Sequence, residues 1–154
     1  MDTYSLRRAE LKDVPTMASH RVRMFEDMGI LAENESAPLL EASALWLEEQ
    51  MLQDKYVGWL VEHEGEIISS GGIHLRETSP VPGCPRIGTG GHLVNIYTEP
   101  AHRRRGLARL IVNTILQWCS ENQVDHITLT ASEEGRPLYE ALGFLPGKEM
   151  KLGL

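Results

Sequence analysis

One basic segment constrains the fold of this chain more than any other feature. It reads Val94-Asn95-Ile96-Tyr97-Thr98-Glu99-Pro100-Ala101-His102-Arg103-Arg104-Arg105-Gly106-Leu107-Ala108-Arg109. We interpret it as a strand over 92–98 that Pro100 ends, followed by a tight turn and a helix over about 104–122. The first turn of a helix has about four backbone N–H groups without internal partners, and the helix dipole adds positive potential. The segment therefore predicts an anion site at the start of this helix.

The residues of the turn suit a phosphate. Gly106 lets the backbone approach the anion, Ala108 keeps the next turn small, and the arginines offer charge-assisted hydrogen bonds. The turn lacks the Gly-Lys-Ser/Thr ending of a Walker loop, and Gly106 alone does not make a dinucleotide-binding fingerprint. A solvated helix start is the plainer interpretation of the arginine run.

The rest of the chain predicts one domain over residues 1–154, with no internal repeat or linker. We expect further strands over 4–8, 56–62, 66–75, 126–130 (buried) and 149–152, and a loop over 76–91. We expect further helices after a cap at Asp13 as far as Gly29, from near Pro38, and over 137–142. This order predicts an α/β (α+β) fold with helices on both faces of a sheet.

Composition excludes several classes of protein. Fifteen Lys and Arg against 22 Asp and Glu give a net charge of −7, which disfavours nucleic-acid binding. The positive charge over 102–105 and at Arg109 suits a small polyanion better than a long one. We expect a cytoplasmic protein, because no membrane-length apolar run or secretory signal is present and Cys84 and Cys119 form no disulfide framework. We expect no metal site.

Two segments carry a family resemblance. Arg103-Arg104-Arg105-Gly106-Leu107-Ala108 resembles the Arg/Gln-x-x-Gly-x-Gly/Ala signature of the GCN5-related N-acetyltransferase (GNAT) superfamily. Ala131-Ser132-Glu133-Glu134-Gly135-Arg136-Pro137-Leu138-Tyr139-Glu140-Ala141-Leu142-Gly143-Phe144 resembles that family's second motif. The order of elements matches over essentially the whole chain, and the residues match over its second half. The resemblance implies a mixed, mostly antiparallel sheet with a cleft where the fourth and fifth strands splay apart.

The resemblance also implies a co-substrate, acetyl-CoA, and the residues that hold it. The backbone of Ile96 and Thr98 would pair with the pantetheine arm, and the Ile96 N–H would face the thioester carbonyl. The amides from Arg104 to Arg109 would surround the pyrophosphate. Ser132 stands where many members have an asparagine. The implied binding residues are Ile96, Tyr97, Thr98, Arg103, Arg104, Arg105, Gly106, Leu107, Ala108, Arg109 and Ser132.

The implied catalytic residue is Tyr139, whose phenol would protonate the departing thiolate. The alternative is that Tyr139 is an amphipathic core residue on a short helix. The base that deprotonates the amine stays open. The candidates are Glu26, Asp27, His74, His92 or a chain of water molecules.

The resemblance implies a direct transfer of the acetyl group to a small-molecule or peptide amine, and it is compatible with a homodimer. The acceptor and the length of the acyl chain stay open. Glu26, Asp27, Glu33 and Glu35 would favour a cationic amine if they face the pocket. The rival hypothesis is a CoA-binding sensor without turnover, which would not need Tyr139.

Overall fold

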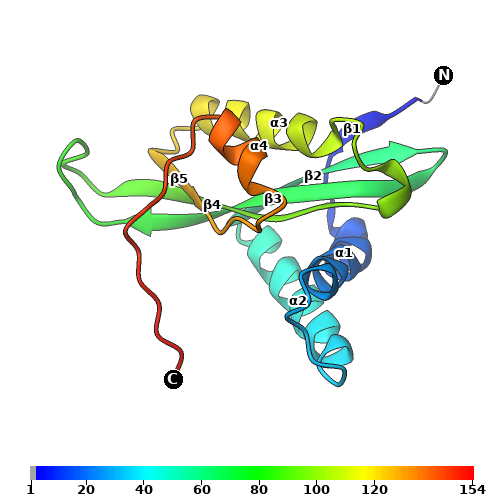
Figure 1. Cartoon of the computed structure of the whole chain (residues 1–154). Coiled ribbons are helices and arrows are strands. Elements are labelled where there is room, and N and C mark those ends of the chain that lie inside the picture. The colour runs from blue at the N-terminus through cyan, green and yellow to red at the C-terminus, as the bar shows by residue number, and fades with distance from the viewer. Residues whose placement is uncertain (1–2) are drawn as a thin grey trace.

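A computed structural model describes residues 3–154, and these form a five-stranded sheet in the order β1-β2-β3-β4-β5, with helices on both faces (Figure 1). The strands are β1 (Ser5–Arg8), β2 (Tyr56–His63), β3 (Glu66–Thr78), β4 (Gly88–Thr98) and β5 (His126–Leu129). The helices are α1 (Val14–Asp27), α2 (Ser36–Leu52), α3 (Leu107–Glu121) and α4 (Arg136–Ala141). Strands β1 to β4 pair antiparallel, and β5 runs parallel to β4. The expected fold class is confirmed.

Each face of the sheet has its own apolar core. Helix α3 buries Ile111 and Ile115, one helical turn apart, against strand residues such as Val61 and Ile73. On the opposite face, α1 and α2 pack Met17, Ala18 and Leu47 against Tyr56 and Leu60. The sheet therefore lies between two helical layers, and α1 and α3 pack on opposite faces of β4 (Figure 1).

Strand β4 leaves its neighbours before it ends. Its parallel ladder with β5 runs from Gly90↔His126 to Leu93↔Leu129, whereas β4 continues to Thr98. The antiparallel ladder with β3 skips from Gly72↔Val94 to Ser70↔Tyr97, so Asn95 and Ile96 lie opposite one residue of β3. This is a β-bulge, which bends the bulged strand and takes an extra residue out of the ladder.

Two glycines of β3 make room for the bulge. A Cβ atom at Gly71 would lie 2.4 Å from Cδ1 of Ile96, and one at Gly72 would lie 2.2 Å from the Tyr56 hydroxyl. Distances this short are not compatible with any side chain, so β3 needs glycine at both positions for Ile96 and Tyr56 to pack where they do.

The prediction of a loop over 76–91 is wrong at both ends. Strand β3 continues to Thr78 and β4 begins at Gly88, which leaves residues 79–87 between the strands. Gly88 and Gly91 look like loop residues in the sequence, but they serve close packing of β4. A Cβ atom at Gly88 would lie 2.5 Å from Asp125, and one at Gly91 would lie 2.8 Å from Ile73.

Four further expectations need correction. Helix α3 begins at Leu107, because Arg104 and Gly106 have left-handed φ values of 62° and 78°. The carboxylate of Asp13 does not cap α1 but accepts hydrogen bonds from Arg7 and from the Glu10 N–H.

Strand β5 is only half-buried along its length, because it is the edge of the sheet. The predicted strand over 149–152 is absent, and the chain has no regular secondary structure after residue 143.

Within residues 3–154, no helix combines the length and the apolar character that crossing a membrane requires.

Candidate active site

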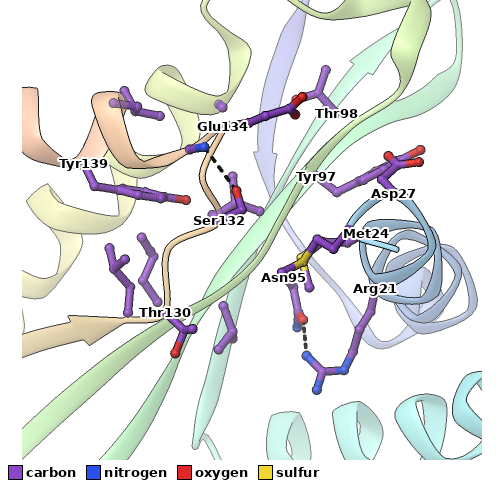
Figure 2. Close-up of a pocket in the computed structure, with 18 of the residues that line it drawn as sticks. Arg21, Met24, Asp27, Asn95, Tyr97, Thr98, Thr130, Ser132, Glu134 and Tyr139 are labelled. Atoms are coloured by element: carbon purple, nitrogen blue, oxygen red, sulfur yellow. Dashed lines mark hydrogen bonds between the residues drawn. The ribbon is translucent and has the colours of Figure 1, made fainter. Parts of the chain in front are cut away.

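A pocket of about 770 Å³ opens where β4 and β5 separate (Figure 2). Its walls come from the second half of α1, from β4 after Gly91, from the turn before α3, and from the segment between β5 and α4. The predicted residues that line it are Ile96, Tyr97, Thr98, Arg103, Arg104, Gly106, Leu107, Ala108, Arg109, Ser132 and Tyr139. The structure therefore gathers both sequence motifs around one cavity.

One end of the pocket is suited to an anion. The first helical hydrogen bond of α3 runs from the Leu110 N–H to the Gly106 carbonyl at 3.0 Å. The N–H groups of Leu107, Ala108 and Arg109 precede it and have no partner within the helix. The left-handed conformation of Gly106 turns the chain into α3, and a Cβ atom there would meet nothing within 4 Å. An oxyanion thus has open space in front of the helix start.

The arginines of the turn divide into different roles. Arg103 pairs with Asp27 at 2.6 Å and donates to the Thr98 carbonyl at 2.8 Å, which ties the turn to α1 and β4. Arg104 and Arg109 line the pocket. Arg105 does not line it, and its guanidinium donates to the Tyr4 hydroxyl at 3.0 Å. A cofactor contact of Arg105 would therefore have to come from its backbone.

The bulge lies at the centre of the pocket and is held by a chain of polar side chains. Asn95 has a left-handed φ of 62° and is buried. Its Oδ1 accepts a hydrogen bond from Arg21 Nη1 at 2.6 Å (Figure 2). Its Nδ2 donates to the Tyr56 hydroxyl at 3.2 Å. Burial raises the pKa of Tyr56 to about 12, so this phenol stays protonated at neutral pH. The neighbouring Ile96 has no partner in the register of either ladder and lines the pocket.

Sequence reasoning missed Arg21, Tyr56 and Asn95. The one local signal for the bulge was the Gly71-Gly72 pair inside a strand, a feature that often marks a close backbone approach.

Tyr139 projects from α4 with its hydroxyl toward the pocket (Figure 2). Its ring packs edge-on against Phe144 with centroids 5.9 Å apart, and burial raises the pKa of the phenol. Nearby, Ser132 accepts a hydrogen bond from the Gly135 N–H at 3.1 Å, so it braces the turn that leads into α4.

The four side chains considered as bases occupy different places. Glu26 accepts a hydrogen bond from Ser36, and His74 lies 3.0 Å from Gln50; neither lines the pocket. Asp27 lines the pocket but is paired with Arg103. His92 also lines it, and its Nδ1 lies 2.7 Å from the Thr128 hydroxyl. Burial, with Arg76 as the next cause, lowers the pKa of His92 and favours its neutral form.

A second polar cluster supports the end of β4. The His20 Nδ1 lies 2.7 Å from the Ser70 hydroxyl, its Nε2 lies 3.5 Å from Glu99, and its ring packs on Tyr97. The side chain is only 2% exposed, and burial, with Arg23 adding to it, lowers the pKa of His20 to about 4. His20 is therefore neutral over the physiological pH range.

The part of the chain that the structure describes holds no group of three or more His, Cys, Asp or Glu side chains placed to bind a metal ion.

The mostly antiparallel sheet, the parallel β4–β5 pair and the pocket between them are the arrangement that the resemblance to the N-acetyltransferases implied. The chain belongs to the Acetyltransferase (GNAT) family, whose model matches residues 18–144. It is 27% identical over 142 residues to the uncharacterized N-acetyltransferase YjgM of Escherichia coli K12, covering 90% of this chain and 80% of that protein.

Two solved structures extend the comparison. A GCN5-related N-acetyltransferase from Ralstonia eutropha superposes with a TM-score of 0.91 at 27% identity, over 99% of both chains. A predicted acetyltransferase from Clostridium acetobutylicum, solved with acetyl-CoA, superposes with a TM-score of 0.87 at 27% identity, over 98% of this chain and 96% of that one.

The buried His20 predicts a loss of stability in acid. Between pH 6.5 and about 4 the unfolded state binds a proton that folded His20 does not, so the free energy of unfolding falls as the pH falls. The step corresponds to ~3 kcal/mol. We measure the free energy of unfolding in urea at pH 7 and at pH 4. We expect this free energy to fall by about that amount more in the wild type than in His20→Gln. Equal acid losses in the two proteins would contradict this account.

Proposed function

We propose that this protein is an acetyl-CoA-dependent N-acetyltransferase that acts on a primary amine within a ternary complex. One observation carries the proposal. A single pocket joins the helix start suited to a phosphate, the strand backbone outside both ladders and the phenol of Tyr139. The structure of the Clostridium relative with acetyl-CoA supports the choice of co-substrate.

In this proposal the pyrophosphate of acetyl-CoA lies against the N–H groups at the start of α3, with Arg104 and Arg109 beside it. The pantetheine arm runs along Ile96 to Thr98 in the gap that β5 leaves, as an added strand would. Its acetyl carbonyl then accepts a hydrogen bond from the Ile96 N–H. Tyr97, Leu107, Ala108 and Ser132 complete the wall around the arm.

The proposed reaction is a direct transfer. The lone pair of the neutral amine attacks the thioester carbon, and the Ile96 N–H stabilises the negative charge that develops on the oxygen. The C–S bond then breaks as the carbonyl re-forms, and the sulfur takes a proton from the Tyr139 hydroxyl. The amine nitrogen gives up a proton, through water or through His92, whose neutral form can accept one. The Tyr139 phenolate then takes up a proton from solvent. The products are an N-acetyl amine and CoA.

A sensor that binds CoA without turnover is the second candidate. It would use the same helix start and the same strand backbone, but it would have no need of a partly buried phenol directed into the pocket. The position of Tyr139 therefore favours the enzyme.

The phosphate site is tested by Gly106→Glu. This change places a carboxylate where the pyrophosphate should lie, and it also strains a left-handed residue. We expect calorimetry to show acetyl-CoA binding weakened at least 100-fold, since like-charge repulsion replaces a charge-assisted contact. Gly147→Glu carries the same charge into open space outside the pocket and should bind as the wild type does.

Circular dichroism on both variants checks that they remain folded. Equal binding of acetyl-CoA by Gly106→Glu and Gly147→Glu would contradict the assignment of this site.

The proton donor is tested by Tyr139→Phe, which keeps the ring packing on Phe144 and removes the hydroxyl. We expect kcat to fall by roughly 10²- to 10⁴-fold, the usual contribution of general acid catalysis. The affinity for acetyl-CoA should stay within a few-fold of the wild type. An unchanged kcat in steady-state assays of CoA release would remove Tyr139 from the mechanism.

We also propose that the protein forms a homodimer through its C-terminal segment. Met150, Leu152 and Leu154 alternate with more polar residues along an extended stretch and are at least 85% exposed. Beside this segment, β5 is the edge strand of the described sheet, with its outer backbone edge unpaired (Figure 1). A second copy that adds its segment to this edge would cover both features.

Light scattering after size exclusion tests the dimer. We expect twice the chain mass of 17.3 kDa for the wild type and a shift to monomer for Leu152→Arg. Glu149→Arg adds charge on the other face of the segment and should remain dimeric. A monomeric wild type would refute the dimer.

We also propose that the protein is cytoplasmic. Cys84 and Cys119 are both free thiols, as a reducing compartment allows.

A further inference from the structure

The charges at the pocket wall also indicate which class of amine the protein accepts. We propose that the acceptor amine carries an oxyanion group, a carboxylate or a phosphate, and that Arg21 binds this group. The inference rests on the proposed function, because it assigns the second substrate of the same site.

Arg21 is a half-buried cation at the pocket wall. It projects from α1 beside Asn95 (Figure 2). Its guanidinium lies 4.9 Å from the centre of the Phe25 ring. Among residues 3–154 it makes one side-chain hydrogen bond, from Nη1 to Asn95, and no ion pair. Burial lowers the pKa of Arg21, and among the described residues no carboxylate pairs with its guanidinium. The Nη2 and Nε donors are left for a ligand.

A second cation, Lys151, also lines the pocket. The His92 imidazole lines it as a neutral group, because burial and then Arg76 lower its pKa. The Glu149 carboxylate acts on His92 in the opposite sense but does not line the pocket. Arg21 and Lys151 in the pocket wall favour an anionic group on the acceptor over a second cationic one.

The carboxylates of the pocket wall do not offset this field. Asp27 is bound by Arg103. Glu134 comes from the segment before α4 and lies across the pocket from Arg21 (Figure 2). Glu26, Glu33 and Glu35 do not line the pocket, so they give no preference for a cationic amine. Asp27 does line it, but its charge is already paired with Arg103.

The position of Arg21 also limits the size of the acceptor. Its hydrogen-bond partner Asn95 is the residue next to Ile96, whose N–H is proposed to hold the thioester carbonyl. The proposed contact to the oxyanion and the proposed contact to the thioester therefore involve neighbouring residues of β4, which favours a small acceptor. Met24, Phe25, Met28 and Ile30 add an apolar wall. We therefore expect a short amino acid or aminoalkyl phosphate, with an apolar side chain allowed.

The test is Arg21→Gln, because glutamine removes the charge and can still donate a hydrogen bond to Asn95. Activity is measured as kcat/KM with two matched pairs of amines: L-phenylalanine with L-phenylalaninamide, and 2-aminoethyl phosphate with ethanolamine. A nearby carboxylate or phosphate raises the pKa of an amine, so the neutral member of each pair has more free amine at neutral pH. A preference for the anionic member must therefore come from binding.

We expect the wild type to prefer the anionic member of at least one pair, and the preferred pair distinguishes carboxylate from phosphate. Arg21→Gln should lower kcat/KM for that member roughly 10- to 100-fold, as loss of a hydrogen bond to a charged group does, and leave its neutral partner within a few-fold. Arg23→Gln removes a charge from the same helix but outside the pocket, and should keep the preference.

Equal use of both members by the wild type, or an equal loss for both in Arg21→Gln, would overturn the inference. The second result would mean that Arg21 acts only by holding the bulge. Acetyl transfer to none of the four amines would count against the proposed function for this panel. In that case calorimetry measures the binding of the same four amines to CoA-saturated protein. If neither anionic amine binds more tightly than its neutral partner, the inference is overturned.

Discussion

The structure depends on one departure from regular β pairing, the bulge at Asn95 and Ile96. A strand backbone saturated by neighbours on both sides has nothing to offer a ligand. In β4 the ladder with β5 has already stopped at Leu93, and the bulge interrupts the ladder with β3. A left-handed asparagine is unfavourable unless its surroundings hold it, and here Arg21 and Tyr56 do so through the two ends of its amide. The break in strand pairing is therefore held by buried side chains and does not depend on a loop.

The remaining elements can be understood by what they do for this interruption. Helix α3 covers one face of β4 and, through the left-handed Gly106, presents its first turn at the end of the same gap. Helix α1 covers the other face and supplies Arg21, while the His20 cluster secures the end of the strand against Ser70 and Glu99. We propose that an extended acyl carrier with a charged end lies between these two layers, with its reactive carbon next to the bulge.

The sequence predicted those parts whose chemistry is local. The turn, the helix after it and the second motif are contiguous, and the structure brings them to one pocket as expected. The contacts that hold the bulge were beyond sequence reasoning, because Arg21 and Asn95 are 74 residues apart and Asn95 and Tyr56 are 39 apart. For the same reason Gly88 and Gly91 looked like loop residues, since the side chains that require glycine there come from Asp125 and Ile73. The alternating pattern of residues 149–152 is that of a strand, but no strand of the described chain pairs with it.

The most direct test of the account is a crystal structure of this protein with acetyl-CoA. The account predicts the pyrophosphate at the N–H groups of Leu107 to Arg109, and the thioester oxygen within about 3 Å of the Ile96 nitrogen, the distance of an N–H···O hydrogen bond. The Tyr139 hydroxyl should lie beside the sulfur. A complex in which acetyl-CoA binds elsewhere, or in which β5 pairs with β4 beyond Leu93 and closes the gap, would contradict the central claim.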